Sequence, residues 1–185
     1  MGPNITTTIS TVKTTTATTL TTTTRPTSCL PGWITFDRGA YKWCMKNYYG
    51  NIEAQNAVAA CQTLDPAATT SGFQTVAEVN TMTAIALAYD STISALHIGA
   101  RRRPECYNVM LTAQCTYLTS FYWSDGYTTG TEAFRWTPGQ PDNQGSPAIN
   151  EAYVDLDVTT GLLDDEWWDW SWPGAVCGIV ISSQG

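Results

Sequence analysis

The sequence predicts an α+β domain, and three observations lead to that prediction. Apolar residues at helical spacing occur early in the chain, short alternating segments typical of strands occur late, and six cysteines fit a disulfide-bonded fold. After the first 28 of its 185 residues, the chain is long enough for one domain with its own core. We therefore expect a single folded domain over residues 29–185.

The first 28 residues differ in composition from the rest of the chain. Fourteen of them are threonine, and such a polar tract cannot bury apolar surface. We expect residues 1–28 to form a disordered tether. Two interpretations stay open: an O-glycosylated stalk, to which Asn4 adds an N-glycosylation sequon, or an unmodified linker.

The expected elements of the domain follow the apolar pattern in chain order. A strand is predicted over 33–41. An amphipathic helix is predicted over 51–64 with Asn51 as its N-cap, and a second helix over about 76–89. Short strands are predicted at 96–100, 153–158 and 175–181.

A long loop is predicted between about residues 135 and 151. Three prolines and two glycines in this stretch exclude a regular element. Loops of this length are usually functional or disordered. A bound ion would order this one.

Cysteine usage indicates a secreted, extracellular protein. The six cysteines are even in number and show no zinc-finger or CxxC spacing, so three disulfides are expected. Fifteen pairings are open from the count alone. Proximity favours Cys106 with Cys115 and Cys29 with Cys44, which would leave Cys61 with Cys177 to close a long loop.

The net charge and its distribution argue against some classes of partner and favour others. The formal net charge is −7 with only nine Lys and Arg, which argues against nucleic acid, because neutralising phosphates requires a basic stripe. No apolar run is long enough to span a membrane. From Trp136 to the C-terminus there are eight Asp and Glu and no Lys or Arg. This local excess of carboxylates predicts a bound cation.

Six segments occur in an order that resembles the C-type lectin-like domain. They are Cys-Leu-Pro-Gly-Trp at 29–33, the helix with Cys61, His-Ile-Gly-Ala at 97–100, Phe-Tyr-Trp-Ser-Asp-Gly at 121–126, Trp-Thr-Pro-Gly-Gln-Pro-Asp at 136–142 and Ala-Val-Cys at 175–177. The resemblance covers nearly everything after the Thr-rich segment. The hairpin from Cys106 to Cys115 is most similar to secreted lectin-like proteins of nematodes, and innate immunity is the role that this implies.

The resemblance implies a fold of two helices flanking antiparallel sheets, with a long calcium- and sugar-binding loop region. It supports the pairs Cys61 with Cys177 and Cys29 with Cys44. One family disulfide is missing, because its two positions align with Tyr153 and Trp168. An aromatic contact between these two side chains could occupy the same space.

The resemblance also implies a ligand set for calcium. Gln140-Pro141-Asp142 resembles the family's galactose-type triplet, for which a cis Pro141 is expected. Calcium prefers carboxylate and amide oxygens. The expected metal ligands are Gln140, Asp142, Glu151, Asp164 and Asp165. Asp164 replaces the usual asparagine, and an ionised aspartate can only accept hydrogen bonds, so the standard pattern toward a sugar is altered there.

The implied function is calcium-dependent binding of galactose-type glycans, without turnover. The expected sugar-binding residues are Gln140, Asp142, Glu151, Asp164, Trp167 and Trp170, the tryptophans by stacking on the ring. The candidates for stacking also include Trp136 and Trp168, although most of these side chains are expected to fill the core or the loop interior. Because single lectin sites are weak, a homo-oligomer with several sites is a plausible assembly. The alternative function is a calcium-independent lectin-like module that binds a protein or another surface.

The remaining polar residues suggest no catalyst. A glycosidase-type acid pair is the weakest hypothesis, because four clustered acids suit an ion better than an acid/base pair. His97, the only histidine, is expected to be a buried and hydrogen-bonded side chain. The basic run 101–103 is expected to form a solvated turn. Five further acids are expected at the surface or in turns: Asp37, Glu78, Asp125, Asp155 and Asp157.

Overall fold

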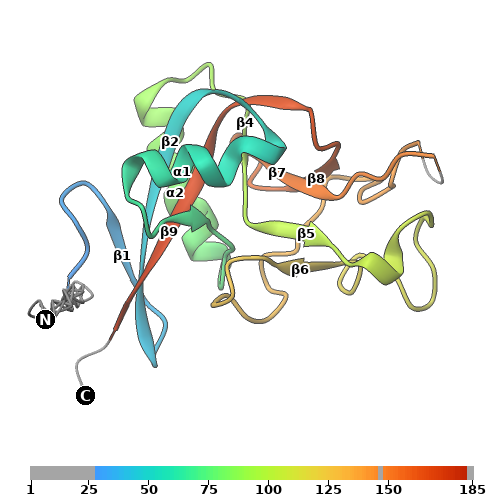
Figure 1. Cartoon of the computed structure of the whole chain (residues 1–185), viewed down its shortest axis with the longest axis horizontal. Coiled ribbons are helices and arrows are strands. Elements are labelled where there is room, and N and C mark those ends of the chain that lie inside the picture. The colour runs from blue at the N-terminus through green and yellow to red at the C-terminus, as the bar shows by residue number, and fades with distance from the viewer. Residues whose placement is uncertain (1–27, 146–147, 183–185) are drawn as a thin grey trace, which may run out of the picture.

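Two long antiparallel strands form the centre of the molecule. In a computed structural model, which describes residues 28–145 and 148–182, β2 (Tyr41–Glu53) pairs with β9 (Ser171–Ser182) along nearly their whole lengths. The start of β2 therefore lies beside the end of β9 (Figure 1). Apart from Ser28, the expected tether and its glycosylation lie outside the described residues.

The other elements extend from this central pair. Within the described residues, the remaining strands are β1 (Ile34–Asp37), β3 (Thr69–Thr70), β4 (Ala95–His97), β5 (Ala100–Arg102), β6 (Phe121–Trp123), β7 (Tyr153–Asp157) and β8 (Leu163–Glu166). The helices are α1 (Ala57–Leu64), α2 (Val76–Tyr89) and two short 3-10 turns, η1 (Ala54–Asn56) and η2 (Pro104–Cys106).

The strands of the described residues form two sheets. The larger has the order β1-β2-β9-β4-β7-β8 with β3 beside β9, and the smaller pairs β5 with β6. Neighbouring strands are antiparallel except β4 and β9, which run parallel. The larger sheet is therefore mixed, whereas the sequence led us to expect antiparallel sheets.

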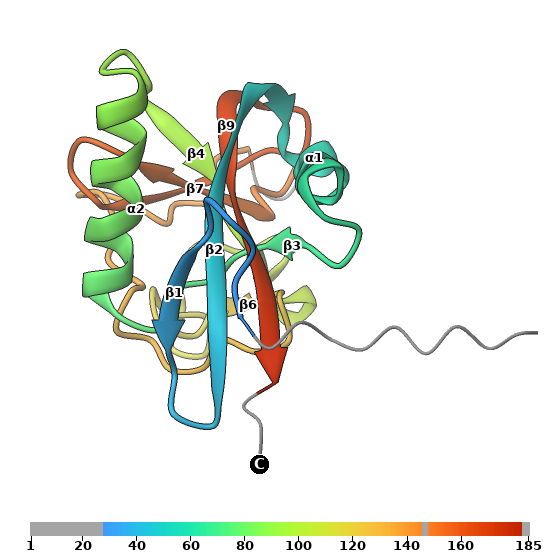
Figure 2. The ribbon, with the colours of Figure 1, turned by 90° about the vertical axis from the view of Figure 1, so that its left-hand side faces the viewer.

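The two α-helices lie on opposite sides of the central pair of strands (Figure 2). On one side α2 contributes Val79 and Met82 to the main core around Trp43. On the other side Ala57 and Cys61 of α1 pack with a second cluster that includes residues of β9. The expected arrangement of two helices flanking a sheet is thus confirmed.

The boundaries of α2 match the prediction, whereas α1 ends at Leu64 as predicted but begins at Ala57 rather than near Asn51. Thr75 caps α2 by accepting a hydrogen bond from the Glu78 backbone N–H at 3.2 Å, which is a local signal. Asn51, the expected N-cap of α1, lies in β2 instead, because the last residues of β2 pair with the start of β9. Pairing between distant segments has overridden the helical pattern there.

Two acids that were expected at the surface are buried. Glu78 is buried and pairs with the Arg38 guanidinium at 2.7 Å, which joins α2 to the turn after β1. Asp125 lies in a turn, as expected, but it is also buried and accepts a hydrogen bond from Gly72 N–H at 2.7 Å. Asp37 is exposed and accepts a bond from Gly39 N–H in its turn.

The six cysteines form the pairs expected from the sequence. The disulfides are Cys29–Cys44, Cys61–Cys177 and Cys106–Cys115. The second joins α1 to β9 and closes the longest loop, with a sequence separation of 116 residues.

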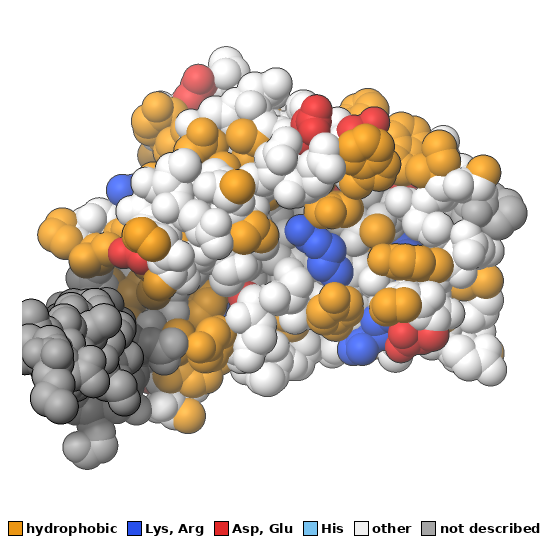
Figure 3. All heavy atoms as spheres, viewed as in Figure 1, with side chains coloured by type: hydrophobic (Ala, Val, Ile, Leu, Met, Phe, Trp, Pro, Cys, Tyr) orange, Lys and Arg blue, Asp and Glu red, His pale blue; other side chains and the backbone are white. Residues whose placement is uncertain are grey.

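The surface carries no continuous basic stripe on the described part of the face in Figure 3, where Lys and Arg side chains lie scattered among uncharged ones. Among the described residues, no helix combines the length and apolar character needed to cross a membrane.

The topology predicts unequal contributions of the disulfides to stability. Replacing Cys61 and Cys177 by alanine should lower the free energy of unfolding by roughly 4–5 kcal/mol, against about 2–3 kcal/mol for Cys106 and Cys115, because the longer loop restricts the unfolded chain more. Urea denaturation of the two double variants checks this. Equal losses would contradict the entropic explanation.

Candidate functional site

The candidate site forms where the long loop between β6 and β7 meets strand β8 (Figure 1). The Gln140–Pro141 peptide bond is cis, as expected. The Asp142 backbone N–H donates to Gln140 Oε1 at 2.9 Å and to Asp165 Oδ1 at 3.0 Å. The Gln-Pro-Asp triplet is therefore attached directly to β8.

Three carboxyl groups converge at this attachment. One carboxylate oxygen from each of Asp142, Glu151 and Asp165 lies within 4.8 Å of the other two. Glu151 and Asp165 are buried, and Asp142 is half-buried. Calcium takes about six to eight oxygen ligands and favours carboxylates. The donor set therefore fits a hard divalent cation.

The two other expected ligands line a cavity beside these carboxyl groups. Gln140 and Asp164 line an open cavity of about 290 Å³, together with Glu151 and Asp165. Burial, and then the charges of Asp165 and Asp142, raise the pKa of Asp164 to about 6. The structure thus brings the five expected ligands to one region and brings carboxylate oxygens of three of them together.

The electrostatics of the cluster favour a cation. Burial, followed by the charge of Asp165, raises the pKa of Glu151 to about 8. Burial also raises the pKa of Asp165, against the opposing effect of Arg102. Without a cation, the cluster reduces its repulsion by holding protons, which a divalent ion would displace.

Arg102 is a component of the site that the sequence analysis missed. Its Nε donates to the Glu151 carbonyl oxygen at 2.7 Å, and its Nη2 forms a salt bridge with Asp165 Oδ2. The guanidinium also lies over the Phe121 ring, with its carbon 4.6 Å from the ring centroid. The expectation of a solvated turn is therefore wrong for Arg102, which is buried, although Arg103 is exposed.

Strand alternation explains the burial of Arg102. Residues two apart on a strand share a face, so Arg102 on β5 shares the buried face of Ala100, while Arg101 points the other way. The alternation is visible in the burial of β5 but not in the sequence, where Ala100 is followed by arginine at every position of the strand.

A second group of polar side chains lies deeper in the same region. His97 is buried, as expected, with Nδ1 2.5 Å from Glu166 Oε1 and Nε2 2.9 Å from the Ile52 carbonyl oxygen. A carbonyl only accepts, so Nε2 carries a proton. Burial lowers the pKa of His97 to about 4, and burial raises the pKa of Glu166. Both shifts favour a neutral imidazole that accepts a hydrogen bond from a protonated carboxyl group over an ion pair.

Asp155 belongs to this deeper group, which corrects the expectation that it faces solvent. It is 4% exposed, stands opposite His97 on β4 and opposite Asp164 on β8, and lines the cavity. Burial, and then the charge of Glu166, raise its pKa. Asp155 lies on a strand that is flanked by β4 and β8, and a hydrogen bond from Trp172 partly opposes the rise in its pKa. Asp157, at the end of β7, is half-buried and accepts bonds within a turn.

Three indole rings form a wall of the cavity. Trp167, Trp170 and Trp172 line it, with successive ring centroids 5.8 Å and 6.2 Å apart in edge-on contacts. Trp170 is 45% exposed. Exposed indole faces next to polar oxygens suit the apolar side of a sugar ring. Trp167 and Trp170 were predicted from the sequence to lie at the site, whereas Trp172 was not.

The other candidate tryptophans lie outside the cavity wall. Trp136 packs beside Phe121, with ring centroids 4.9 Å apart, and its Nε1 donates to the Tyr117 carbonyl oxygen. Trp168 is 48% exposed. Tyr153, at the other position of the missing family disulfide, lies under the Arg101 guanidinium at 3.7 Å. A cation–π contact thus occupies the Tyr153 position.

Solved structures with the same fold are C-type lectin domains. The C-type lectin CEL-I from Cucumaria echinata has a TM-score of 0.60 at 19% identity, covering 83% of this chain and 98% of that one. The cow CD23 carbohydrate-recognition domain, solved with a GlcNAc2Man3 oligosaccharide, gives 0.57 at 19% (85% and 99% covered). The Ca2+-independent C-type lectin SPL-2 from Saxidomus purpuratus gives 0.56 at 20% (82% and 93% covered).

The structural similarity establishes the fold of the chain. No protein-family model matches the sequence, and a search of curated proteins finds no match. The chain therefore has the α+β C-type lectin-like fold, although neither comparison based on sequence finds a match.

The raised pKa values predict how stability depends on pH. Glu151 and Asp164 hold protons more tightly in the folded chain than in the unfolded one, where carboxyl pKa values are near about 4. Stability is therefore greatest below about pH 4 for these groups and is lost as pH rises through about 6 for Asp164 and about 8 for Glu151.

In chelator-treated protein, deprotonation of Asp164 and Glu151 should lower the melting temperature by at least about 4 °C between pH 5 and pH 8.5. Calcium should flatten the dependence, because it stabilises the ionised carboxylates. Scanning calorimetry across this range, with and without calcium, checks both statements. A melting temperature that rises with pH in chelator would contradict the first.

Proposed function

We propose that this chain is a carbohydrate-binding domain that holds a galactose-type sugar through a calcium ion in its long loop. The observation that carries the proposal is the convergence of carboxylate oxygens from Asp142, Glu151 and Asp165 beside a cavity walled by tryptophans. The cavity has the combination typical of small-ligand sites, an aromatic wall with a few polar groups. The C-type lectin-like fold supports the same class of function.

Each residue of the site has a separate task in this proposal. Asp142, Glu151 and Asp165, with Gln140 and Asp164 from the cavity wall, would hold the ion. The bound ion would supply coordination positions for two neighbouring sugar hydroxyls. Gln140 can both donate to and accept from a hydroxyl, whereas ionised Asp164 only accepts. The exposed Trp170 face would cover the apolar side of the ring, and the task is recognition without turnover.

The biological setting follows from the same features. Three disulfides suit an oxidising, extracellular compartment. Glycans of microbial or host origin are the partners that the proposal implies. A single sugar site binds a glycan weakly, so a homo-oligomer with several sites would raise the avidity for glycans.

A second candidate function is calcium-independent binding of a protein or another surface, and Arg102 favours it. Its guanidinium already places a positive charge on Asp165 and binds the Glu151 carbonyl. The loop then has its shape without an ion. SPL-2 has the same fold and is a Ca2+-independent C-type lectin, so the fold itself does not demand the ion.

Replacing Asp142 by asparagine separates the two functions. The substitution keeps the size of the side chain and removes one charged ligand, so calcium affinity should fall by roughly 100-fold or more and galactose binding should fall with it. Calorimetric titration of calcium and then galactose measures both. The matched control is Asp169→Asn, a change at an exposed acid that is not among the cavity-lining residues. Galactose binding that survives both chelator and Asp142→Asn would select the calcium-independent function.

The tryptophan wall gives an independent test of the sugar contact. Trp170→Ala should weaken galactose binding by roughly 3- to 10-fold, the usual contribution of an aromatic contact, and leave calcium affinity unchanged. Trp168→Ala is the matched control, because Trp168 is 48% exposed against 45% for Trp170 but does not line the cavity. An equal effect of both substitutions on sugar binding would count against stacking on Trp170.

A further inference from the structure

Asn143 connects two residues of the candidate site to a separate loop. It is 1% exposed and has a left-handed backbone, with φ of 51°. Its backbone N–H donates to Asp165 Oδ2 at 3.0 Å, and its side-chain Oδ1 accepts from the Glu151 N–H at 3.0 Å. Its Nδ2 group donates to the Val109 carbonyl oxygen at 2.8 Å. Asn143 thus contacts Asp165 and Glu151 of the acidic cluster and also the loop that carries Val109.

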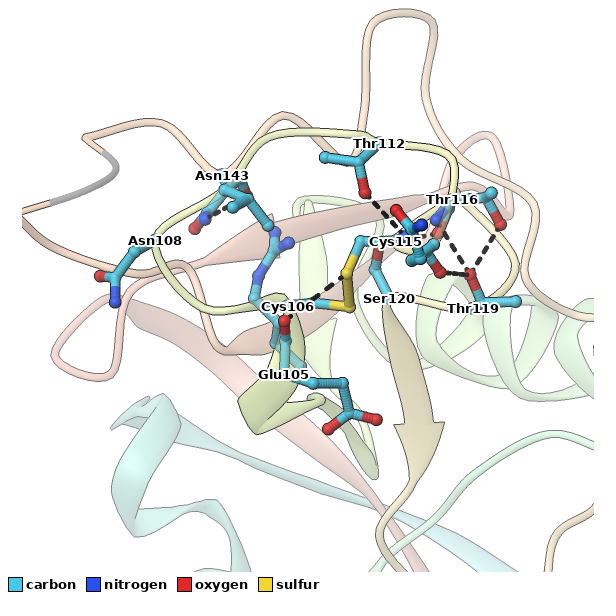
Figure 4. The surroundings of a disulfide bond; sticks show 12 residues. Glu105, Cys106, Asn108, Thr112, Cys115, Thr116, Thr119, Ser120 and Asn143 are labelled. Atoms are coloured by element: carbon cyan, nitrogen blue, oxygen red, sulfur yellow. Dashed lines mark hydrogen bonds between the residues drawn. A yellow bond between two sulfur atoms is a disulfide. The ribbon is translucent and has the colours of Figure 1, made fainter.

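The loop that carries Val109 is closed by the Cys106–Cys115 disulfide (Figure 4). Both sulfur-bearing residues are buried. The Cys115 N–H donates to Thr112 Oγ1, and the Thr112 N–H donates to the Cys115 carbonyl oxygen, both at 2.9 Å. The disulfide and these two hydrogen bonds therefore hold the loop that contacts Asn143 through Val109.

A second contact joins the same two loops. The Asn108 backbone N–H donates to Asn150 Oδ1 at 2.6 Å, and Asn150 Nδ2 donates to Asn108 Oδ1 at 3.1 Å. Asn150 directly precedes Glu151 and also accepts from Asn143 Nδ2 at 3.2 Å. In Figure 4, Asn143 and Asn108 lie at one end of the disulfide-closed loop.

We propose that the disulfide-closed loop 106–115 is a brace for the candidate site, and that Asn143 is the positioning residue through which it acts. The inference rests on the proposed function. The segment that supplies Asp142 and Glu151 has no helix or strand of its own in its described part. The Asn143 bonds attach this segment to a covalently closed neighbour instead.

The chemistry of position 143 suits asparagine. The left-handed backbone favours Asn, Asp or Gly. The side chain must accept from Glu151 N–H and donate to the Val109 carbonyl, and an amide does both while a carboxylate only accepts. Outer partners that orient metal ligands commonly change metal affinity by about 10- to 100-fold when they are lost.

The test uses Asn143→Gly, which keeps the left-handed backbone and the N–H to Asp165 but removes the side chain. Asn108→Gly is the comparison variant, because Asn108 has a similar φ of 59° but its exposed side chain supplies only the outer contact of the brace, to Asn150. In calorimetric titration, Asn143→Gly should weaken calcium binding by roughly 10- to 100-fold, and Asn108→Gly by less than about threefold.

A second readout does not require calcium. In chelator-treated protein, the backbone amides of Asp142, Gln144 and Glu151 donate within the site, so their hydrogen exchange reports how firmly it is held. Exchange at these amides should become about tenfold faster or more in Asn143→Gly. The amides of β2 and β9 should exchange as in the unchanged chain, which separates a local effect from global destabilisation.

Two further variants keep the proposal testable if Asn143→Gly does not fold. Asn143→Asp retains the acceptor for Glu151 but cannot donate to Val109, and the double change Cys106→Ala with Cys115→Ala opens the brace; each should accelerate the same amides. Unchanged exchange in the variants that fold would overturn the brace, even where calcium binds. A chain that binds no calcium but shows accelerated exchange would overturn the proposed function and leave the brace standing.

Discussion

The antiparallel pairing of β2 with β9 is the constraint on which the rest of the structure depends. β4 pairs with β9 at His97 and Ala175. β7 then pairs with β4 at Asp155 and His97, and β8 pairs with β7 at Asp164 and Asp155. One row of residues thus runs from the centre of the sheet to the acidic cavity. Because side chains alternate between faces, a slip of one residue at any of these pairs would turn the acids away from the cavity. The Cys61–Cys177 disulfide, which ties α1 to β9, holds the start of this row.

The same row explains why the acids fall into two groups with different chemistry. The inner group, Asp155 and Glu166, is covered by His97 and Trp172, and burial favours its protonated form. The outer group, Asp142, Glu151 and Asp165, converges beside Arg102, which pairs with Asp165. Burial raises carboxyl pKa values in both groups, but only in the second do three carboxylate oxygens of the described residues lie within 4.8 Å of one another, as a cation site requires. On β8 the side chains alternate, so Asp165 of the outer group lies on the other face from Glu166 of the inner group.

Sequence reasoning was reliable where a signal was local or covalent. The second helix, the three disulfide pairs and the cis Gln140–Pro141 bond were each predicted from a signal within a few residues or from the family pattern. It failed where neighbours from distant segments decided the outcome. Asp155 is buried because β4 and β8 flank it, Asn51 is extended because β9 pairs with the end of β2, and Arg102 is buried because β5 turns it onto Asp165. No property of these residues taken singly reports such contacts.

Arg102 and Asn143 together change the free-energy cost of binding calcium. In a loop held only by its ion, part of the binding free energy is spent on ordering the chain. Here the Glu151 carbonyl, the Glu151 N–H and the Asp165 carboxylate are already held by protein groups. The ordering cost is then small, but Arg102 repels the incoming ion and competes for Asp165. Preorganisation and repulsion therefore act in opposite directions on calcium affinity. The bonds of Arg102 and Asn143 to Glu151 and Asp165 do not involve the ion, so these parts of the loop keep their positions whichever of the two effects is larger.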